Sequence, residues 1–355
     1  MAHVQTQFIE FHGTIRLGTY EENAILRTKR ETLLRDLKAG LKKLFNDRGQ
    51  DPPEYATINQ GSYKINTGIC PLKGDYDLDI GVLFQIDKTN HPDPVVVKKW
   101  VFDALLRPNR TVEMKGPCVR VQYLSDGEPD HHVDLAVYAA GPSGEGLRSL
   151  GRGKLNSTEA QRYWEDADPE GLTATIVTRY TDEDAAQFRR VIRALKRWKH
   201  EKFAIGGNSA PPSIGLTLAI HKADWFQPVK KLKDTVQGTY EYDDRLALEQ
   251  LTRNMVNAFM GTLGQRRLHL WLPVRPWTDV FAKMTDAQQE VFFERLVRLR
   301  DALLAAGNEP KRKQACELLR AEFGDDFPVP DDEPKEEARK FSAPAYVGST
   351  SGAWN

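Results

Sequence analysis

Two aspartates alternate with apolar residues on one strand-like segment of this 355-residue chain, Asp77-Leu78-Asp79-Ile80. Successive side chains of a strand point to opposite faces, so the two carboxylates are expected on the same face. Neighbouring carboxylates repel one another unless a cation lies between them. Mg²⁺ is the natural occupant, because it takes oxygen ligands and shares them with substrate phosphates. Asp134, in HHVDLAVY, is a candidate third ligand from another strand.

Such a carboxylate set is typical of nucleotidyl transfer, in which a ribose 2′- or 3′-hydroxyl attacks an α-phosphate and pyrophosphate leaves. Two ions about 3.5–4 Å apart activate the hydroxyl and neutralise the departing phosphates. We predict that Asp77 and Asp79 hold two Mg²⁺ ions, which Mn²⁺ can replace, and that Asp134 completes the site. Asp75 and Asp77 also alternate, so a pair shifted by two residues stays open. The apolar run after Asp79 favours the later pair.

The alternative without function is that Asp77 and Asp79 stand at a polar strand end and that Asp134 is a lone acid on its strand. Strands are depleted in Asp, so several aspartates on apolar strands argue against this alternative. His131 and His132 precede Asp134. We expect them to be structural or exposed, because a hard carboxylate site does not need imidazole.

Gly61 and Ser62 form a turn shortly before the acidic strand. A Gly-Ser turn lets backbone amides and the hydroxyl approach the β- and γ-phosphates closely. The motif is weak by itself and becomes informative because the acids follow it.

A basic helix is expected at 188–203, where apolar residues recur at helical spacing. For most of its cations a solvated face is the simpler interpretation, whereas Lys196 adjoins the apolar stripe and is predicted to reach a triphosphate. Ser213 follows two prolines and opens an apolar helix. We expect it to be the N-cap, and a helix start also binds anions. The cations are Arg189, Arg190, Arg193, Lys196, Arg197 and Lys199.

Composition narrows the classes of protein. Fifty basic residues balance fifty acidic ones, which argues against a general nucleic-acid binder. The three cysteines form no CxxC pair, so we expect a reducing, cytoplasmic location without disulfides or structural zinc. We expect neither a secretory signal nor a membrane span.

The pattern along the chain predicts a mixed α/β (α+β) catalytic lobe, a helical lobe and an active site in the cleft between them. We place an N-terminal segment at 1–20, the catalytic lobe at 21–180, the helical lobe at 181–328 and a flexible tail at 329–355. A long helix is expected at 21–46 and a mobile loop at 141–157. The expected strands are 55–58, 77–86, 118–124 and 133–139, and the other expected helices are 95–106, 183–202, 213–224, 243–263, 285–305 and 310–322.

Taken together, these segments resemble the bacterial cGAS/DncV-like nucleotidyltransferases (CD-NTases), relatives of cyclic GMP-AMP synthase and oligoadenylate synthase. The resemblance covers about residues 55–225 and rests on four segments in the family's order: QGSYKINTGI with KGDYDLDIGV, CVRVQYL with HHVDLAVYAA, RRVIRALKRWK, and PPSIGLTLA. It implies a polymerase-β-like palm with a helical lobe, and products that are cyclic di- or trinucleotides made from nucleoside triphosphates such as ATP and GTP. The family's metal acids fall on Asp77, Asp79 and Asp134, its Gly-Ser turn on Gly61 and Ser62, and its triphosphate-binding Lys and Ser on Lys196 and Ser213.

The resemblance also implies partners and departures. Such enzymes serve anti-phage (CBASS) operons, and their product signals to a separate effector. In many operons an E1/E2-like protein acts on the C-terminus, which the tail here could suit. The zinc-containing insertion of the animal synthase has no counterpart, so we expect no activation by DNA. Ile214 stands where the animal enzyme has a base-stacking aromatic residue, so base preference is not carried over.

Two alternatives stay open. One is another transferase: a linear-oligonucleotide or RNA-tailing enzyme, or one that modifies a protein or drug. A tailing enzyme should carry a basic RNA-binding surface, which the charge balance does not favour. The other is a non-catalytic nucleotide sensor that keeps the fold. Loss of one of the three acids would have favoured a sensor, but all three are present.

Overall fold

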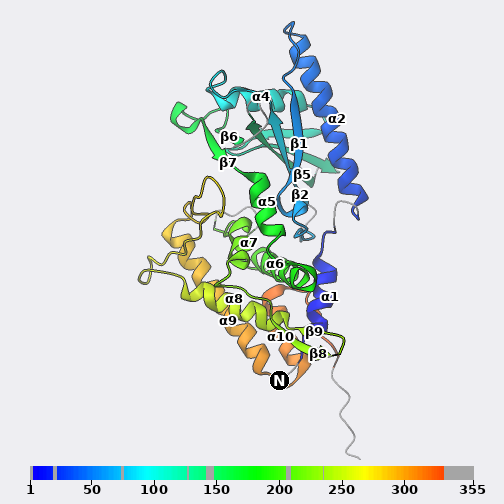
Figure 1. The fold of residues 1–355 in the computed structure, drawn as a ribbon, viewed down its shortest axis with the longest axis vertical. Coiled ribbons are helices and arrows are strands. Elements are labelled where there is room, and N and C mark those ends of the chain that lie inside the picture. The colour runs from blue at the N-terminus through cyan, green and yellow to red at the C-terminus, as the bar shows by residue number, and fades with distance from the viewer. Residues whose placement is uncertain are drawn as a thin grey trace, which may run out of the picture.

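A computed structural model of the chain describes residues 3–18, 22–72, 76–125, 128–140, 148–204, 209–234 and 236–331. Within these ranges no helix is long and apolar enough to cross a membrane. The described chain forms a lobe built on a β-sheet and a lobe built of helices, which follow one another along the long axis of the molecule (Figure 1).

The sheet lobe contains a seven-stranded sheet in which β1, β2, β5, β4 and β3 are neighbours in that order, while β6 joins β5 to β7. The β2–β5 pair is parallel, and the other pairs are antiparallel. Its strands are β1 (Tyr55–Gln60), β2 (Tyr76–Phe84), β3 (Arg110–Met114), β4 (Val119–Ser125), β5 (Glu128–Ala139), β6 (Arg148–Arg152) and β7 (Tyr163–Ala167). Its helices are α2 (Ala24–Asn46), α3 (Gly61–Lys64) and α4 (Pro94–Leu105), and α5 (Pro169–Val177) follows the last strand and packs on the helical lobe.

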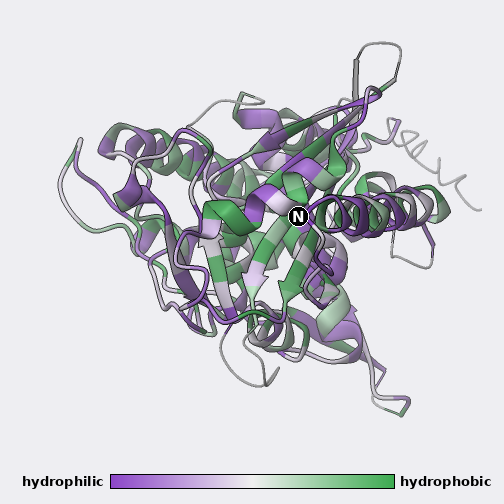
Figure 2. Ribbon diagram, turned by 90° about the horizontal axis from the view of Figure 1, so that it is seen from above, coloured by the Kyte–Doolittle hydropathy of each residue, from purple (hydrophilic) through white to green (hydrophobic). Residues whose placement is uncertain are grey.

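One face of the sheet is covered by α2 and α4, whose apolar side chains share a core with the strands. The side chain of Asn23 caps α2 by accepting a hydrogen bond from the amide of Leu26. Leu33, Leu37 and Leu41, spaced by four residues, are buried. The strands in the centre of the hydropathy view are accordingly largely hydrophobic (Figure 2). Leu78, Ile80 and Val82 of β2 point into this core, so the alternate residues of β2 point to the opposite face.

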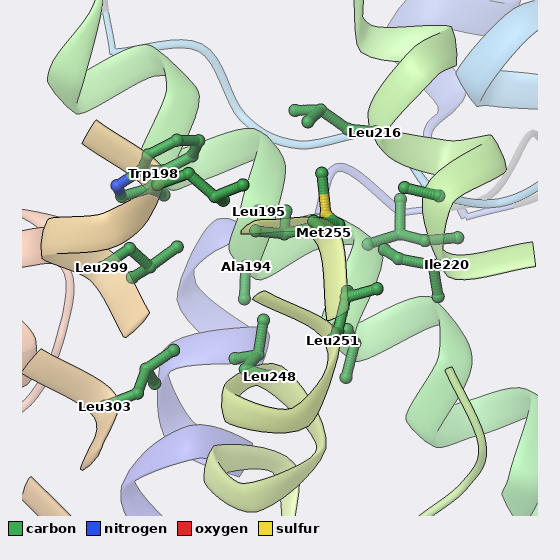
Figure 3. Close-up of a cluster of buried hydrophobic side chains, with 14 of the residues drawn as sticks. Ala194, Leu195, Trp198, Leu216, Ile220, Leu248, Leu251, Met255, Leu299 and Leu303 are labelled. Carbon is green, nitrogen blue, oxygen red and sulfur yellow. The ribbon is translucent and has the colours of Figure 1, made fainter. Parts of the chain in front are cut away.

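The helical lobe is built around α6, which packs against helices before and after it in the chain. Figure 3 shows Leu195 and Trp198 of α6 converging with apolar side chains of α7, α8 and α9. The elements of this lobe are α1 (Gln5–Ile15), α6 (Asp182–Lys202), α7 (Ser213–His221), β8 (Lys230–Asp234), β9 (Thr239–Tyr242), α8 (Asp244–Asn257), α9 (Asp286–Asn308) and α10 (Arg312–Phe323).

The first described helix belongs to this second lobe. Phe8 and Phe11 of α1 pack edge-on or tilted against Phe323 and Phe327, so the two ends of the described chain share one core. Ile176 of α5 lies in the same core. The domain boundaries drawn from the sequence stay predictions, and the tail from residue 332 onward lies outside the described residues.

The predicted fold class, with a mixed α/β lobe and a helical lobe, is confirmed. The loop expected at 141–157 is wrong in part, because β6 occupies its second half and pairs with β5 and β7. Residues 141–147 lie outside the described residues. Short elements without clear periodicity were not predicted, namely α1, α3, β3, β7, α5 and the β8–β9 hairpin.

Candidate active site

A cavity of about 270 Å³ lies between the two lobes. The sheet lobe lines it from α3 and β2, and the helical lobe lines it from α6 and α7, with α5 lining it between them. Among its lining residues are Gly61, Ser62, Asp77, Asp79, Lys196 and Ser213. All the sequence-predicted site residues except Asp134 therefore line one cavity.

The strand register brings the three predicted acids to one face of the sheet. In the parallel β2–β5 pair, Asp79 lies opposite Asp134, and Asp77 lies opposite His132. Arg120 of β4 is the partner of Asp134 on its other side. Because paired residues point to the same face, the acids stand as neighbours on adjacent strands. We call Asp77, Asp79 and Asp134 the acidic side of the site.

Asp79 is the most electrostatically strained of the three. Burial, together with the charges of Asp77 and Asp134, raises its pKa to about 8. Its carboxylate lies against the backbone of Gly61, because a Cβ added there would come within 1.8 Å of Asp79 Oδ2. Gly61 also has φ +63°, a left-handed conformation that favours glycine. Only glycine therefore fits between Asp79 and the start of α3.

Asp77 has a histidine partner. Nε2 of His132 lies 3.1 Å from Asp77 Oδ1. Although the surrounding protein disfavours its charged form, the hydrogen bond from His132 and nearby positive charges hold the pKa of Asp77 below its usual value. His131 and His132 are both buried, so neither is exposed. That they are structural stays a prediction, and His132 contacts a predicted metal ligand.

Asp134 is held by an arginine. Arg120 donates from Nε and from one terminal nitrogen to the two carboxylate oxygens of Asp134, each at 2.8 Å. This bidentate geometry fixes the carboxylate plane. Because strands alternate, Arg120 lies on the same sheet face as the acids while Val119 and Val121 are buried on the other.

The basic side of the site consists of Lys196 and Lys199 of α6 with Ser213 of α7. Nζ of Lys196 donates to the carbonyl and the hydroxyl of Thr67, each at 3.0 Å. Burial lowers the pKa of Lys196 to about 7. Lys199 donates to Ser213 Oγ at 2.8 Å, and burial also lowers its pKa. Ser213 Oγ thus accepts from an ammonium group, which leaves its own O–H to donate to a ligand.

Two expectations for this region are wrong. Pro212, not Ser213, is at the N-cap of α7, because Ser213 already has helical geometry. The basic face of α6 is also less solvated than expected, since Arg193, Lys196 and Arg197 are buried.

The buried cations Arg193, Lys196 and Arg197 donate hydrogen bonds to backbone carbonyls of the loop that follows α3. Arg193 donates to the carbonyls of Asn66 and Gly68, and Arg197 donates to that of Cys70. Each bond to a charged donor contributes about 1.5–3 kcal/mol. These cations therefore fasten the loop that follows α3 in the sheet lobe to the central helix of the other lobe.

The donor set suits a divalent cation. Ligand atoms of Asp77, His132 and Asp134 all lie within 4.8 Å of one another. A cation among these oxygens would also offset the repulsion that raises the pKa of Asp79. The residues present therefore fit a divalent metal ion. Nucleotidyl transfer uses such ions to activate the attacking hydroxyl and to neutralise the leaving phosphates.

Sequence reasoning missed Arg120, His132 and Lys199. Two of them carried a readable signal: His132 precedes Asp134 by two residues on a strand, and Lys199 follows Lys196 by three on a helix, so each pair shares a face. Arg120 became interpretable only through the β4–β5 register.

A strand-borne set of acids facing a buried lysine and serine across a lobe boundary is the arrangement of a nucleotidyltransferase. Residues 55–138 match the family model of the cyclic GMP-AMP synthase DncV-like nucleotidyltransferase domain. Residues 55–138 thus match a DncV-like nucleotidyltransferase domain, and over this range the resemblance read from the sequence is confirmed.

Solved structures agree on the fold. The CD-NTase CdnG of Bradyrhizobium diazoefficiens, in complex with GTP, superposes with a TM-score of 0.67 at 15% identity, covering 91% of this chain and 96% of that one. A mutant of the Vibrio cholerae di-nucleotide cyclase DncV with ATP and GTP gives a TM-score of 0.65 at 14% identity, covering 92% and 97%. The Vibrio cholerae DncV cyclic AMP-GMP synthase, a prokaryotic cGAS homologue, also gives 0.65 at 14% identity, covering 90% and 96%.

Proposed function

We propose that this nucleotidyltransferase is a Mg²⁺-dependent enzyme that joins nucleoside triphosphates into a cyclic di- or trinucleotide. The observation that carries the proposal is the cavity, where the predicted phosphate-binding residues of α3, α6 and α7 face the acids of β2. Support for the cyclic product comes from the similar structures, among them a cyclic AMP-GMP synthase.

In the proposed reaction a ribose hydroxyl of one nucleotide forms a bond to the α-phosphorus of another. The bond from that phosphorus to the bridging oxygen breaks, and pyrophosphate leaves. Asp77, Asp79 and Asp134 would hold two divalent ions, which supply charge neutralisation and a more acidic attacking hydroxyl when bound. A second transfer within the linear intermediate closes the ring.

The basic side binds the leaving phosphates in this scheme. Lys196 supplies a charge and Ser213 a hydroxyl donor that Lys199 polarises. Gly61 brings the α3 backbone against Asp79, so phosphates bound there lie beside the acidic side. Burial of Lys196 strengthens its attraction for phosphate, because water screens the charge less.

We further propose that the product is a second messenger for anti-phage defence, read by a separate effector. An E1/E2-like partner at the C-terminus belongs to the same proposal. Its target, the tail, lies outside the described residues.

Product analysis tests the proposed reaction. The protein is incubated with ATP, GTP, CTP and UTP and Mg²⁺ or Mn²⁺, beside the variant Asp77→Ala/Asp79→Ala. A matched control is Asp224→Ala, whose side chain is 83% exposed and does not line the cavity. We expect a phosphatase-resistant product of cyclic mass from the wild type and Asp224→Ala only.

Other outcomes separate the alternatives. Linear products would support an oligonucleotide or tailing enzyme. Nucleotide binding by calorimetry without any product, under all metal conditions, would support a sensor. Product made by the double variant at the wild-type rate would overturn the assignment of the acids.

A further inference from the structure

Two adjacent histidines of β5 lie on opposite faces of the sheet. The ring of His131 stacks on Tyr123, with 4.3 Å between centroids, and its Nδ1 lies 3.0 Å from Nζ of Lys29. His132 instead faces the acids, with Nε2 3.1 Å from Asp77 Oδ1. One imidazole is thus part of the packing beneath α2, and the other belongs to the candidate metal site.

The position of His132 is set by rigid structure. It pairs with Asp77 in the parallel β2–β5 register and stands two residues before Asp134 on the same strand face. Strand β5 is flanked by β2 and β4 along this stretch. His132 is 7% exposed, so its ring has little freedom to swing into solvent. Ligand atoms of Asp77, His132 and Asp134 lie within 4.8 Å of one another.

This donor set differs from the all-oxygen set that the sequence predicts. Mg²⁺ prefers oxygen ligands and retains several waters. An imidazole nitrogen shifts affinity toward divalent transition ions, which bind nitrogen donors more strongly than Mg²⁺ does. As a ligand, the imidazole is neutral and carries its proton on Nδ1.

We propose that His132 supplies Nε2 as a ligand beside Asp77 and Asp134, and that this mixed nitrogen–oxygen position takes a transition ion such as Mn²⁺ in preference to Mg²⁺. The inference rests on the proposed metal-dependent function and deepens it by naming a further ligand and the class of ion. The alternative role for His132 is to position Asp77 through its hydrogen bond, without touching the ion.

Pulsed electron paramagnetic resonance of Mn²⁺ bound to the full-length protein separates the two roles. A directly bound imidazole gives nitrogen modulation of the Mn²⁺ signal, and labelling the histidines with ¹⁵N changes its frequency. We expect this modulation in the wild type, its loss in His132→Gln and its retention in His131→Gln. His200 also lines the cavity, so His200→Gln is a second control that should retain the modulation.

Metal affinity gives a second readout that needs no turnover. Removing a direct ligand is expected to weaken Mn²⁺ binding by more than the about 10–100-fold that loss of an outer-shell partner costs, while Mg²⁺ binding changes less. His131→Gln should leave both affinities unchanged.

The outcomes are distinct for the inference and for the proposed function. Mn²⁺ binding without nitrogen modulation in the wild type, or modulation that survives in His132→Gln, overturns the inference and leaves a carboxylate-only metal enzyme. Failure of the wild type to bind either ion, with or without nucleotide, overturns both. The ¹⁵N comparison uses wild-type protein, so together with retention of the modulation in His131→Gln and His200→Gln it assigns the nitrogen even if His132→Gln fails to fold.

Discussion

The acidic and basic sides of the cavity hold opposite charges, and each side holds them against the cost of burial. On the sheet, burial and neighbouring carboxylates raise the pKa of Asp79 to about 8. On α6, burial lowers the pKa of Lys196 to about 7. In both cases the protein disfavours the charged form. A nucleotide triphosphate with its cations would relieve both sides at once, so the pair of shifts is what a site built for a charged complex should show.

The largest predicted effect is the loss of turnover when Asp79→Asn removes one carboxylate from the acidic side. Loss of a metal-binding carboxylate should remove several kcal/mol of transition-state stabilisation, which lowers turnover about 1000-fold. Unfolding temperatures at pH 8 should nevertheless rise, because the variant no longer buries a charge that the folded protein disfavours. Steady-state kinetics and calorimetry measure the two effects. Asp224→Asn, at an exposed position, should change neither.

This prediction has a defined pH window. The folded-state pKa of Asp79 lies above its unfolded value of 3.8, so the folded protein holds the proton more tightly. The group therefore costs no stability below that value and costs progressively more as pH rises toward about 8. A pH–stability curve of Asp79→Asn that runs parallel to the wild-type curve throughout this window would show that Asp79 is not strained.

Breaking the basic side with Lys196→Met should mainly reduce nucleotide binding. A hydrogen bond from a charged donor contributes about 1.5–3 kcal/mol, which corresponds to roughly a 10–100-fold loss of affinity. Isothermal titration with ATP or GTP in the absence of divalent metal measures this loss separately from the acidic side. Lys231→Met, at an exposed position of β8, is the matched control. Unchanged affinity in Lys196→Met would remove Lys196 from the phosphate site.

A smaller effect sharpens the description of the basic side. If Lys199 acts by polarising Ser213, then Lys199→Met and Ser213→Ala should each weaken nucleotide binding about tenfold, and the double variant should be little weaker than either. Contacting residues commonly show such coupling, with interaction energies of about 0.5–3 kcal/mol. Fully additive losses would indicate that Lys199 contacts phosphate independently of Ser213.

The two sides also differ in how far the sequence alone defined them. The acidic side could be predicted because Asp77 and Asp79 are two residues apart, and the alternation of side chains along a strand depends only on neighbouring residues. The basic face of α6 was misjudged because its partners are remote: Arg193 bonds a carbonyl 125 residues away in the chain. Local periodicity shows which residues share a face, but it does not show what that face contacts.

Register explains the remaining gap. The contact of His132 with Asp77, and that of Arg120 with Asp134, exist because β2 and β4 flank β5 in one particular alignment. A shift of one residue would move each side chain to the other face. Helices with long periodic patterns, such as α2 and α9, were predicted within a few residues. Short strands such as β6 and β7 had no comparable pattern.

The smallest predicted effect is the pH dependence of stability that Lys196 contributes, and its sign is opposite to that of Asp79. The folded-state pKa of Lys196, about 7, lies below its ordinary value of 10.5, so the unfolded chain binds the proton more tightly. The free energy that folding loses by burying the charged lysine is largest below pH 7. It decreases as pH rises from about 7 toward 10.5. Relative to the wild type, Lys196→Met should therefore gain stability at pH 6.5 and lose more than half of that gain by pH 9, in thermal unfolding without nucleotide or metal. Bound triphosphate should favour the charged lysine, so nucleotide binding at pH 8 should take up protons in the wild type and less in the variant. Calorimetry in buffers of different ionisation enthalpy measures that uptake. Equal uptake in both proteins would mean that the triphosphate does not reach the lysine, and the two sides of the cavity would then not share one ligand.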